Sequence, residues 1–140
     1  NEIKSFISNK FWKYEIEDNA YSILRSNKNI IAMIHSSATQ WEHLFELKIT
    51  FQKGFIYLKG ILSGSKSYGK EKLIIGKKIN NRIVRKTLVF KKDDSWKMEI
   101  DEFADSILSK KKISNGTFED ALKTMQLVQS IYASDSNWKN

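Results

Sequence analysis

The sequence predicts an α+β fold: an open, mostly antiparallel sheet of about six or seven strands, with two C-terminal helices packed on one face. Two observations predict this fold. Up to about residue 90, apolar and polar side chains tend to alternate, as they do in strands with one buried face. After residue 93 the apolar residues recur at helical spacing. Runs of strands followed by helices are typical of α+β domains.

Seven segments have the composition of strands and are separated by short polar turns. The clearest is "HLFELKITF", in which Phe45, Leu47, Ile49 and Phe51 lie on one side and mostly polar residues on the other. The Gly/Ser-rich stretch 63–69 is expected to form a longer loop. The expected strands are residues 2–8, 19–26, 30–37, 43–51, 55–62, 71–77 and 82–90.

Two helices are expected after the strands. In the first, Asp94 or Ser95 is placed to cap the start, because short polar side chains accept hydrogen bonds from free N–H groups there. The second begins near Thr117, which forms a variant capping box with Asp120. The apolar stripes of the two helices are Trp96, Ile100, Phe103 and Ile107, and Phe118, Ala121, Leu122, Met125, Val128 and Tyr132.

The first helix is rich in carboxylates, which raises the question of a catalytic or metal site. Asp94, Asp101, Glu102 and Asp105 fall mainly on the faces away from the apolar stripe. Carboxylates also suit a helix N-terminus, where the helix dipole is positive. We therefore expect these acids to be the solvent side of a packing helix.

Length and composition indicate a single domain over residues 1–140. The chain is 41% hydrophobic, shows no linker and contains no cysteine, which excludes disulfides, thiolate nucleophiles and cysteine-ligated zinc. No uncharged apolar run approaches the roughly 18 residues of a membrane span, and the opening residues do not resemble a signal peptide. We expect a cytoplasmic protein with no membrane partner.

Enzyme motifs are incomplete in this sequence. His35, His43 and the neighbouring serines suggest Ser-His-acid hydrolysis, but no nucleophile elbow surrounds the serines. The phosphate-loop lookalike "GSKSYGKE" has Glu71 where a Mg²⁺-binding Ser or Thr belongs, and a strand is expected after it. We expect neither site.

The net charge of +8 raises the possibility of a nucleic-acid partner. The segment "KGFIYLKG" (53–60) partly matches an RNA-recognition signature, but that fold needs a helix after its first strand, and none is expected before residue 93. We expect solvated surface charge and no nucleic-acid partner. A stand-alone basic module that binds nucleic acid or another polyanion remains the alternative.

The C-terminal third is "DDSWKMEIDEFADSILSKKKISNGTFEDALKTMQLVQSIYAS", in which Glu99, Phe103 and Ile107 lie on one helix, followed by a loop with glycine and a helix that ends in "IYAS". In these features it resembles the end of Gfo/Idh/MocA-type oxidoreductases, the glucose–fructose oxidoreductase and inositol dehydrogenase family. Upstream, "IEDNAYSILRSNKNIIAMIHSS" and "HLFELKITFQKGFIYLKG" resemble two hairpins of the family, although Phe51 stands where the first glycine usually is. The resemblance covers most of residues 15–134. Its matching positions are Asp18, Ser37, Gly54, Glu99, Phe103, Ile107, Gly116, Glu119, Ala121, Ile131, Tyr132 and Ser134.

The resemblance implies that the chain is one part of an NAD(P)-dependent enzyme acting on a sugar or cyclitol. Members have an N-terminal Rossmann domain with an E-K-P lysine, and a D-x-x-x-H motif that supplies acid–base groups. None of these is in this chain, so no catalytic or cofactor-binding residue is carried over, and NAD or NADP belongs to the parent protein. We expect the chain to begin just after the D-x-x-x-H motif.

The same resemblance implies the partners and a substrate-binding surface. The partners are the parent's Rossmann domain, a sugar-like substrate and other copies of the chain, which meet at the exposed sheet face. Trp41, His35 and Ser37, at the end of the third strand and in its following loop, are the expected pocket-wall residues. The alternatives are a core position for Trp41 and plain strand-end or loop positions for all three.

Overall fold

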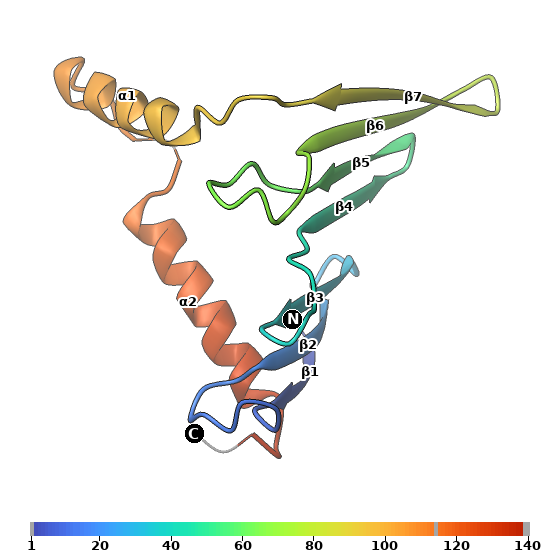
Figure 1. Ribbon diagram of the computed structural model, residues 1–140, viewed down its shortest axis with the longest axis vertical. Coiled ribbons are helices and arrows are strands. Elements are labelled where there is room, and N and C mark those ends of the chain that lie inside the picture. The colour runs from blue at the N-terminus through green and yellow to red at the C-terminus, as the bar shows by residue number, and fades with distance from the viewer. Residues whose placement is uncertain (1, 114, 139–140) are drawn as a thin grey trace. The chain divides into compact units, whose positions relative to one another are not determined.

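The structure, a computed structural model, describes residues 2–113 and 115–138 (Figure 1). Seven strands precede two helices in the chain, so the predicted α+β class is confirmed. The elements are β1 (Glu2–Ser8), β2 (Asn19–Arg25), β3 (Ile31–Ser37), β4 (Glu46–Phe51), β5 (Gly54–Lys59), β6 (Lys72–Ile79), β7 (Arg82–Val89), α1 (Ser95–Leu108) and α2 (Phe118–Ala133).

The strands form two antiparallel sheets where the sequence predicted one open sheet. One sheet has the order β1-β2-β3 and the other β4-β5-β6-β7. The chain accordingly divides into two compact units, residues 40–110 and the remainder. Alternation specifies which face of a strand is apolar, but it does not specify which strand edges pair, and this explains the difference.

The first unit contains the three-stranded sheet and α2. Ser26 and Ile30 close the β2–β3 turn through a backbone hydrogen bond of 2.9 Å, with Asn29 at a φ of 60°. The C-terminal end of α2 lies against β1, where the Ser134 hydroxyl donates to Ser5 Oγ at 2.8 Å. The carboxylate of Asp135 accepts from the backbone N–H of Ile7 at 2.7 Å.

The second unit contains the four-stranded sheet and α1. Asn80 and Asn81 form the two-residue turn between β6 and β7, with φ of 46° and 59°. Two consecutive left-handed residues match the twist of a tight hairpin, and asparagine tolerates that conformation well. Gly60 has a φ of 73°, and a Cβ there would lie 2.5 Å from the Lys70 carbonyl oxygen. Only glycine fits that position without strain.

The two helices begin with different caps. The Thr117 side chain and Asp120 form the predicted capping box at α2, which is confirmed. At α1 the N-cap residue is Asp94, as expected, but its side chain makes no capping hydrogen bond. Asp93 instead accepts from the N–H and the hydroxyl of Ser95, and these bonds lower the pKa of the Asp93 carboxyl.

Among the described residues no apolar side chain is buried, and neither helix contributes a buried residue. This differs from the expected packing of both helices on one sheet face. α2 touches the first sheet only near its C-terminal end, and the stripe of α1, including Trp96 at 76% exposure, stays in solvent. Helical spacing predicted the stripes correctly, but it does not determine what covers them.

No helix in the described part of the chain has the length and apolarity to cross a membrane.

Candidate functional site

The three-stranded sheet has an exposed apolar face, which we call the Phe6 face. Residues paired across neighbouring antiparallel strands share a face, so the register assigns every side chain of the sheet to one of its two faces. Each large apolar member is at least 48% exposed. The Phe6 face contains Phe6, Tyr21, Ile23, Ile31 and Met33.

The opposite face of that sheet is polar at its centre and partly covered. Ser5 and Ser22 pair in register and are 5% and 2% exposed, with their hydroxyls 2.9 Å apart. Ser134, at the end of α2, donates to Ser5. Each buried hydroxyl thus has a partner, as buried polar groups require. The helix therefore occupies the serine side and leaves the Phe6 face open.

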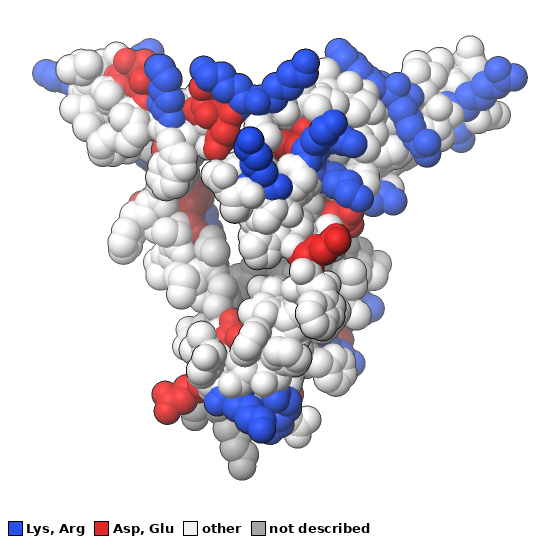
Figure 2. All heavy atoms as spheres, in the orientation of Figure 1, with Lys and Arg blue, Asp and Glu red and all other residues white. Residues whose placement is uncertain are grey.

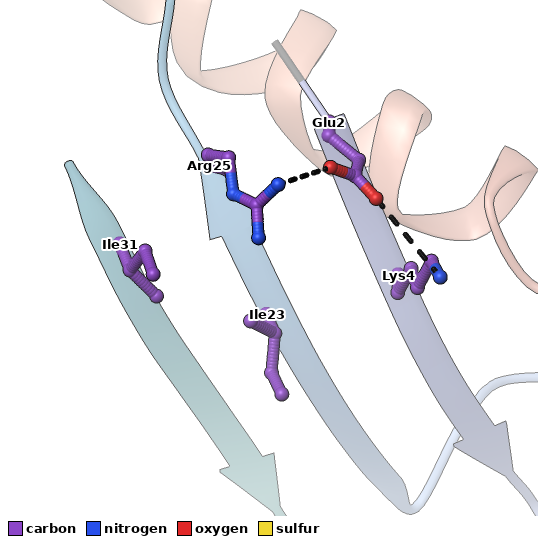
Figure 3. A pocket seen from close by; sticks show the side chains of 5 residues that line it. All are labelled: Glu2, Lys4, Ile23, Arg25 and Ile31. Atoms are coloured by element: carbon purple, nitrogen blue, oxygen red, sulfur yellow. Dashed lines mark hydrogen bonds and ion pairs between the residues drawn. The ribbon is translucent and has the colours of Figure 1, made fainter. Parts of the chain in front are cut away.

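A shallow hollow of about 170 Å³ lies on the Phe6 face (Figure 3). It is lined by Glu2, Lys4, Ile23, Arg25 and Ile31, which come from all three strands. Glu2 accepts from Arg25 at 3.2 Å and lies 3.9 Å from the Lys4 ammonium, as the dashed lines show. The two cations share one acid over an apolar floor, so the hollow can bind an apolar group beside a charged one.

The structure brings two of the three predicted pocket residues to this same face. The ring of His35 stacks on Tyr21 with centroids 3.9 Å apart, and Ser37 lies at the end of β3 with its hydroxyl 3.1 Å from Thr39. Trp41 belongs to the other unit, and its side chain is fully exposed, so a core position for it is excluded. The substrate-binding role of these residues stays a prediction.

A loop of exposed aromatic residues follows β1, and sequence reasoning did not select it as a site. Asp18, only 4% exposed, accepts from the backbone N–H groups of Phe11 and Trp12 at 2.8 and 3.0 Å. The Trp12 indole donates to the Ala38 carbonyl at 3.1 Å. The sequence contained a signal for this loop: aromatic residues spaced too irregularly for a helix or a strand, followed by an acid directly before a strand.

Another polar contact joins this region to α2. The Tyr132 hydroxyl forms a hydrogen bond with Glu17, which together with partial burial raises the pKa of Tyr132 to about 12. The hydroxyl therefore stays protonated, and a donor to the carboxylate, across the whole physiological range.

The four-stranded sheet also presents an apolar face, which we call the leucine face. One row across all four strands is Leu47, Leu58, Leu73 and Leu88, and the next contains Ile49, Ile56 and Ile75. Leu47 and Ile49 on the edge strand are 44% and 42% exposed. Near the β6–β7 turn this face ends in cations. Those cations are Lys77, Arg82 and Lys86.

The other side of the four-stranded sheet is the basic face, defined by Lys48, Lys59, Lys72, Lys78 and Arg85. Its one acid, Glu46, bonds to the Tyr57 hydroxyl and pairs with Lys59 at 3.2 Å. The Tyr57 hydrogen bond, and then Lys59, lower the pKa of Glu46. The same hydrogen bonds to Glu46 raise the pKa of Tyr57 and of Lys59.

Phe55 lies at the centre of the basic face and is held over a glycine. A Cβ built on Gly76 would lie 2.2 Å from Cε1 of Phe55, so the ring occupies the space that a side chain would fill. Lys48 Nζ lies 5.9 Å and Arg85 Cζ 6.0 Å from the ring centroid, within cation–π range. The face thus combines fixed aromatic surface with cations.

The remaining catalytic candidates do not assemble into a site. His43 Nδ1 contacts the Ser67 hydroxyl and the ring stacks on Tyr68, but no carboxylate orients the imidazole within the described residues. The glycine-rich loop leads into β6, where a phosphate loop needs a helix. Residues 2–113 and 115–138 contain no group of His, Asp and Glu suited to hold a metal.

A scan against protein-family models found no match, and searches of curated proteins and of solved structures found none either.

Proposed function

We propose that this chain is an assembly and substrate-side domain of a larger cytoplasmic NAD(P)-dependent oxidoreductase and is not a complete enzyme. The substrate class follows the family resemblance: a sugar or a cyclitol. The nicotinamide cofactor and the acid–base groups belong to another domain of the parent protein. One observation carries the proposal: no apolar side chain of the described residues is buried.

Exposed apolar area on this scale needs a covering partner. Monomeric proteins rarely expose contiguous apolar patches larger than a few hundred Å², and larger ones mark interfaces. The Phe6 face offers five large side chains from three strands, and the leucine face offers seven from four. Burying such side chains contributes roughly 25 cal/mol for each Å² of apolar surface. A second copy and a neighbouring domain of the same protein supply that cover.

The Phe6 face is the side that favours contact between copies. A twofold axis pairs a surface with itself, and an open sheet face without α2 over it allows that contact. The hollow beside Ile23 and Ile31 lies at one end of this face and Ser37 at the other, with His35 in the row of Phe6 and Tyr21. A contact between copies over the Phe6 row covers His35 and leaves the hollow open to a substrate.

The coding sequence upstream of Asn1 tests the oxidoreductase part of the proposal. We expect one open frame of about 150–200 residues, a further domain's length, with a Gly-rich nucleotide loop, an E-K-P and a D-x-x-x-H. A start codon immediately upstream would contradict it. Calorimetric titration of the 140-residue chain with NADH and NADPH is the companion test. Tight binding of either nucleotide by this chain would contradict the proposal that the cofactor binds to another domain.

A further inference from the structure

The charge of the chain is concentrated on the four-stranded sheet. Residues 46–92 contain 13 Lys and Arg but only two acids, whereas the rest of the chain contains 11 Lys and Arg and 14 acids. Figure 2 shows basic side chains gathered over the β6–β7 hairpin. An excess this local produces a positive potential on one sheet, which favours a polyanionic partner.

The one acid of the basic face does not offset this potential. Glu46 is already engaged by Tyr57 and Lys59. Lys48, Lys72, Lys78 and Arg85 form no ion pair with a carboxylate in the described residues, so four cations remain to contact a ligand. They come from β4, β6 and β7, and two of them, Lys48 and Arg85, lie 5.9 and 6.0 Å from the centroid of the Phe55 ring.

We infer that the basic face binds single-stranded nucleic acid, with Phe55 as the base-stacking platform and Lys48, Lys72, Lys78 and Arg85 as phosphate contacts. Proteins that bind single strands combine a positive surface with aromatic rings on which bases stack. Phe55 is half-buried and lies over Gly76, so its ring is preorganised for stacking. The inference is independent of the proposed function, because it uses the face opposite the leucine face.

Stacking is what distinguishes this ligand from other polyanions. An acidic protein segment or an anionic lipid surface would use the cations but not the ring. In a duplex the bases are paired and stacked inside, so their flat faces are not available. A single strand can use the ring and the cations at once. One of its bases stacks on the ring while the neighbouring phosphates contact the cations.

Fluorescence anisotropy with a labelled 12-nucleotide oligo-dT tests the inference. Four phosphate contacts, at a slope of about 0.7 per contact for single strands, predict a Kd that rises about 50-fold between 50 and 200 mM salt. Phe55→Leu keeps an apolar residue there and is expected to weaken binding by about 5-fold or more without changing the salt slope. Lys48→Ala and Arg85→Ala should each lower the slope by about 0.7.

Matched controls lie on the other face of the same sheet. Lys77→Ala and Lys86→Ala remove the same charge from the leucine face and should leave the salt slope unchanged. Duplex DNA and polyglutamate are expected to compete poorly. Competition by polyglutamate equal to that of oligo-dT would overturn the inference, as would equal binding by Phe55→Leu. Equal effects of Lys86→Ala and Lys48→Ala on the salt slope would mean that the oligonucleotide binds through overall charge and not at the basic face. That result would also overturn the inference.

Discussion

The two sheets of this protein differ in the residues that are buried around them. All the buried polar residues of the described structure lie in the unit with the three-stranded sheet: Ser5, Asp18, Ser22 and Asp135. Hydrogen bonds from α2 and from the loop after β1 converge on them. In the unit with the four-stranded sheet, residues 40–110, the only buried residues are two glycines, Gly60 and Gly76.

The difference teaches what each sheet presents to a partner. The first sheet fixes its helix-bearing side with polar contacts and leaves one apolar face open. The second has more apolar side chains on its leucine face and more cations on its basic face, and none of these side chains is buried. We propose contact between copies for the first sheet, and for the second a covering domain on one side and a polyanion on the other.

The largest expected effect tests whether the two sheets lose stability separately. In Gly54→Ala the new Cβ would meet the Gly76 carbonyl oxygen at 2.1 Å, a backbone atom of the neighbouring strand. Overpacking of this kind costs about 1–3 kcal/mol. We expect faster amide hydrogen exchange throughout β4–β7 and unchanged exchange in β1–β3.

Gly64→Ala is the matched control, because a Cβ there meets nothing within 4 Å. It should leave exchange in both sheets unchanged. Equally accelerated exchange in the two sheets of Gly54→Ala would mean that they unfold as one cooperative body. That result would contradict the expectation that the two sheets lose stability separately.

A smaller effect is expected from the serine pair that characterises the first sheet. Ser22→Ala leaves the buried Ser5 hydroxyl with Ser134 as its remaining partner, so the loss in unfolding free energy should be about 1 kcal/mol. Ser36→Ala changes an exposed serine on the same sheet side and should have no measurable effect. Urea unfolding compares the two, and equal midpoints would count against a stabilising role for the buried pair.

The smallest effect concerns the capping box of α2. Thr117→Ala removes the acceptor of the Asp120 N–H and should cost about 0.5 kcal/mol, the lower end for a cap at an exposed helix start. Thr124→Ala, within the same helix, is the control. Circular dichroism during thermal unfolding measures both, and a Thr117 variant no weaker than the Thr124 variant would refute the contribution of the cap.

The same cap should respond to pH with a defined sign. The Thr117 hydroxyl, and then its backbone N–H, hold the pKa of Asp120 below its ordinary value. The contribution of this carboxylate is therefore present above the unfolded-state pKa of about 3.9 and is lost as pH falls through the lower folded-state pKa. Asp120→Asn should remove that part of the acid dependence, whereas a pH profile identical to that of the unchanged chain would contradict the assignment.

Much of the local structure could be predicted from the sequence. Strand 2–8 was located to the residue, and both helices begin within two residues of their expected caps, because alternation and capping are local signals. The separation of the two sheets was not predictable, since it depends on which strand edges pair. Nor was the position of Phe55 over Gly76, which requires the register of β5 against β6.

The candidate site was predictable only in part. His35 and Ser37 share the Phe6 face because they are two residues apart on one strand, which alternation indicates. Trp41 follows the end of that strand by four residues, and no local pattern determines the unit to which such a residue belongs. The aromatic loop held by Asp18 was missed because its contacts are between backbone N–H groups and a carboxylate, which leave no periodic signal.

Sedimentation velocity of the chain and of Phe6→Lys tests the central claim, that the Phe6 face is an interface. Phe6 is 76% exposed and lies in the row with Tyr21 and His35, so a lysine there places a charge within the proposed contact. Phe11→Lys, at a loop residue 63% exposed, is the matched control. The account predicts an oligomer for the chain and for Phe11→Lys, and a monomer for Phe6→Lys. An unchanged sedimentation coefficient in Phe6→Lys would contradict it.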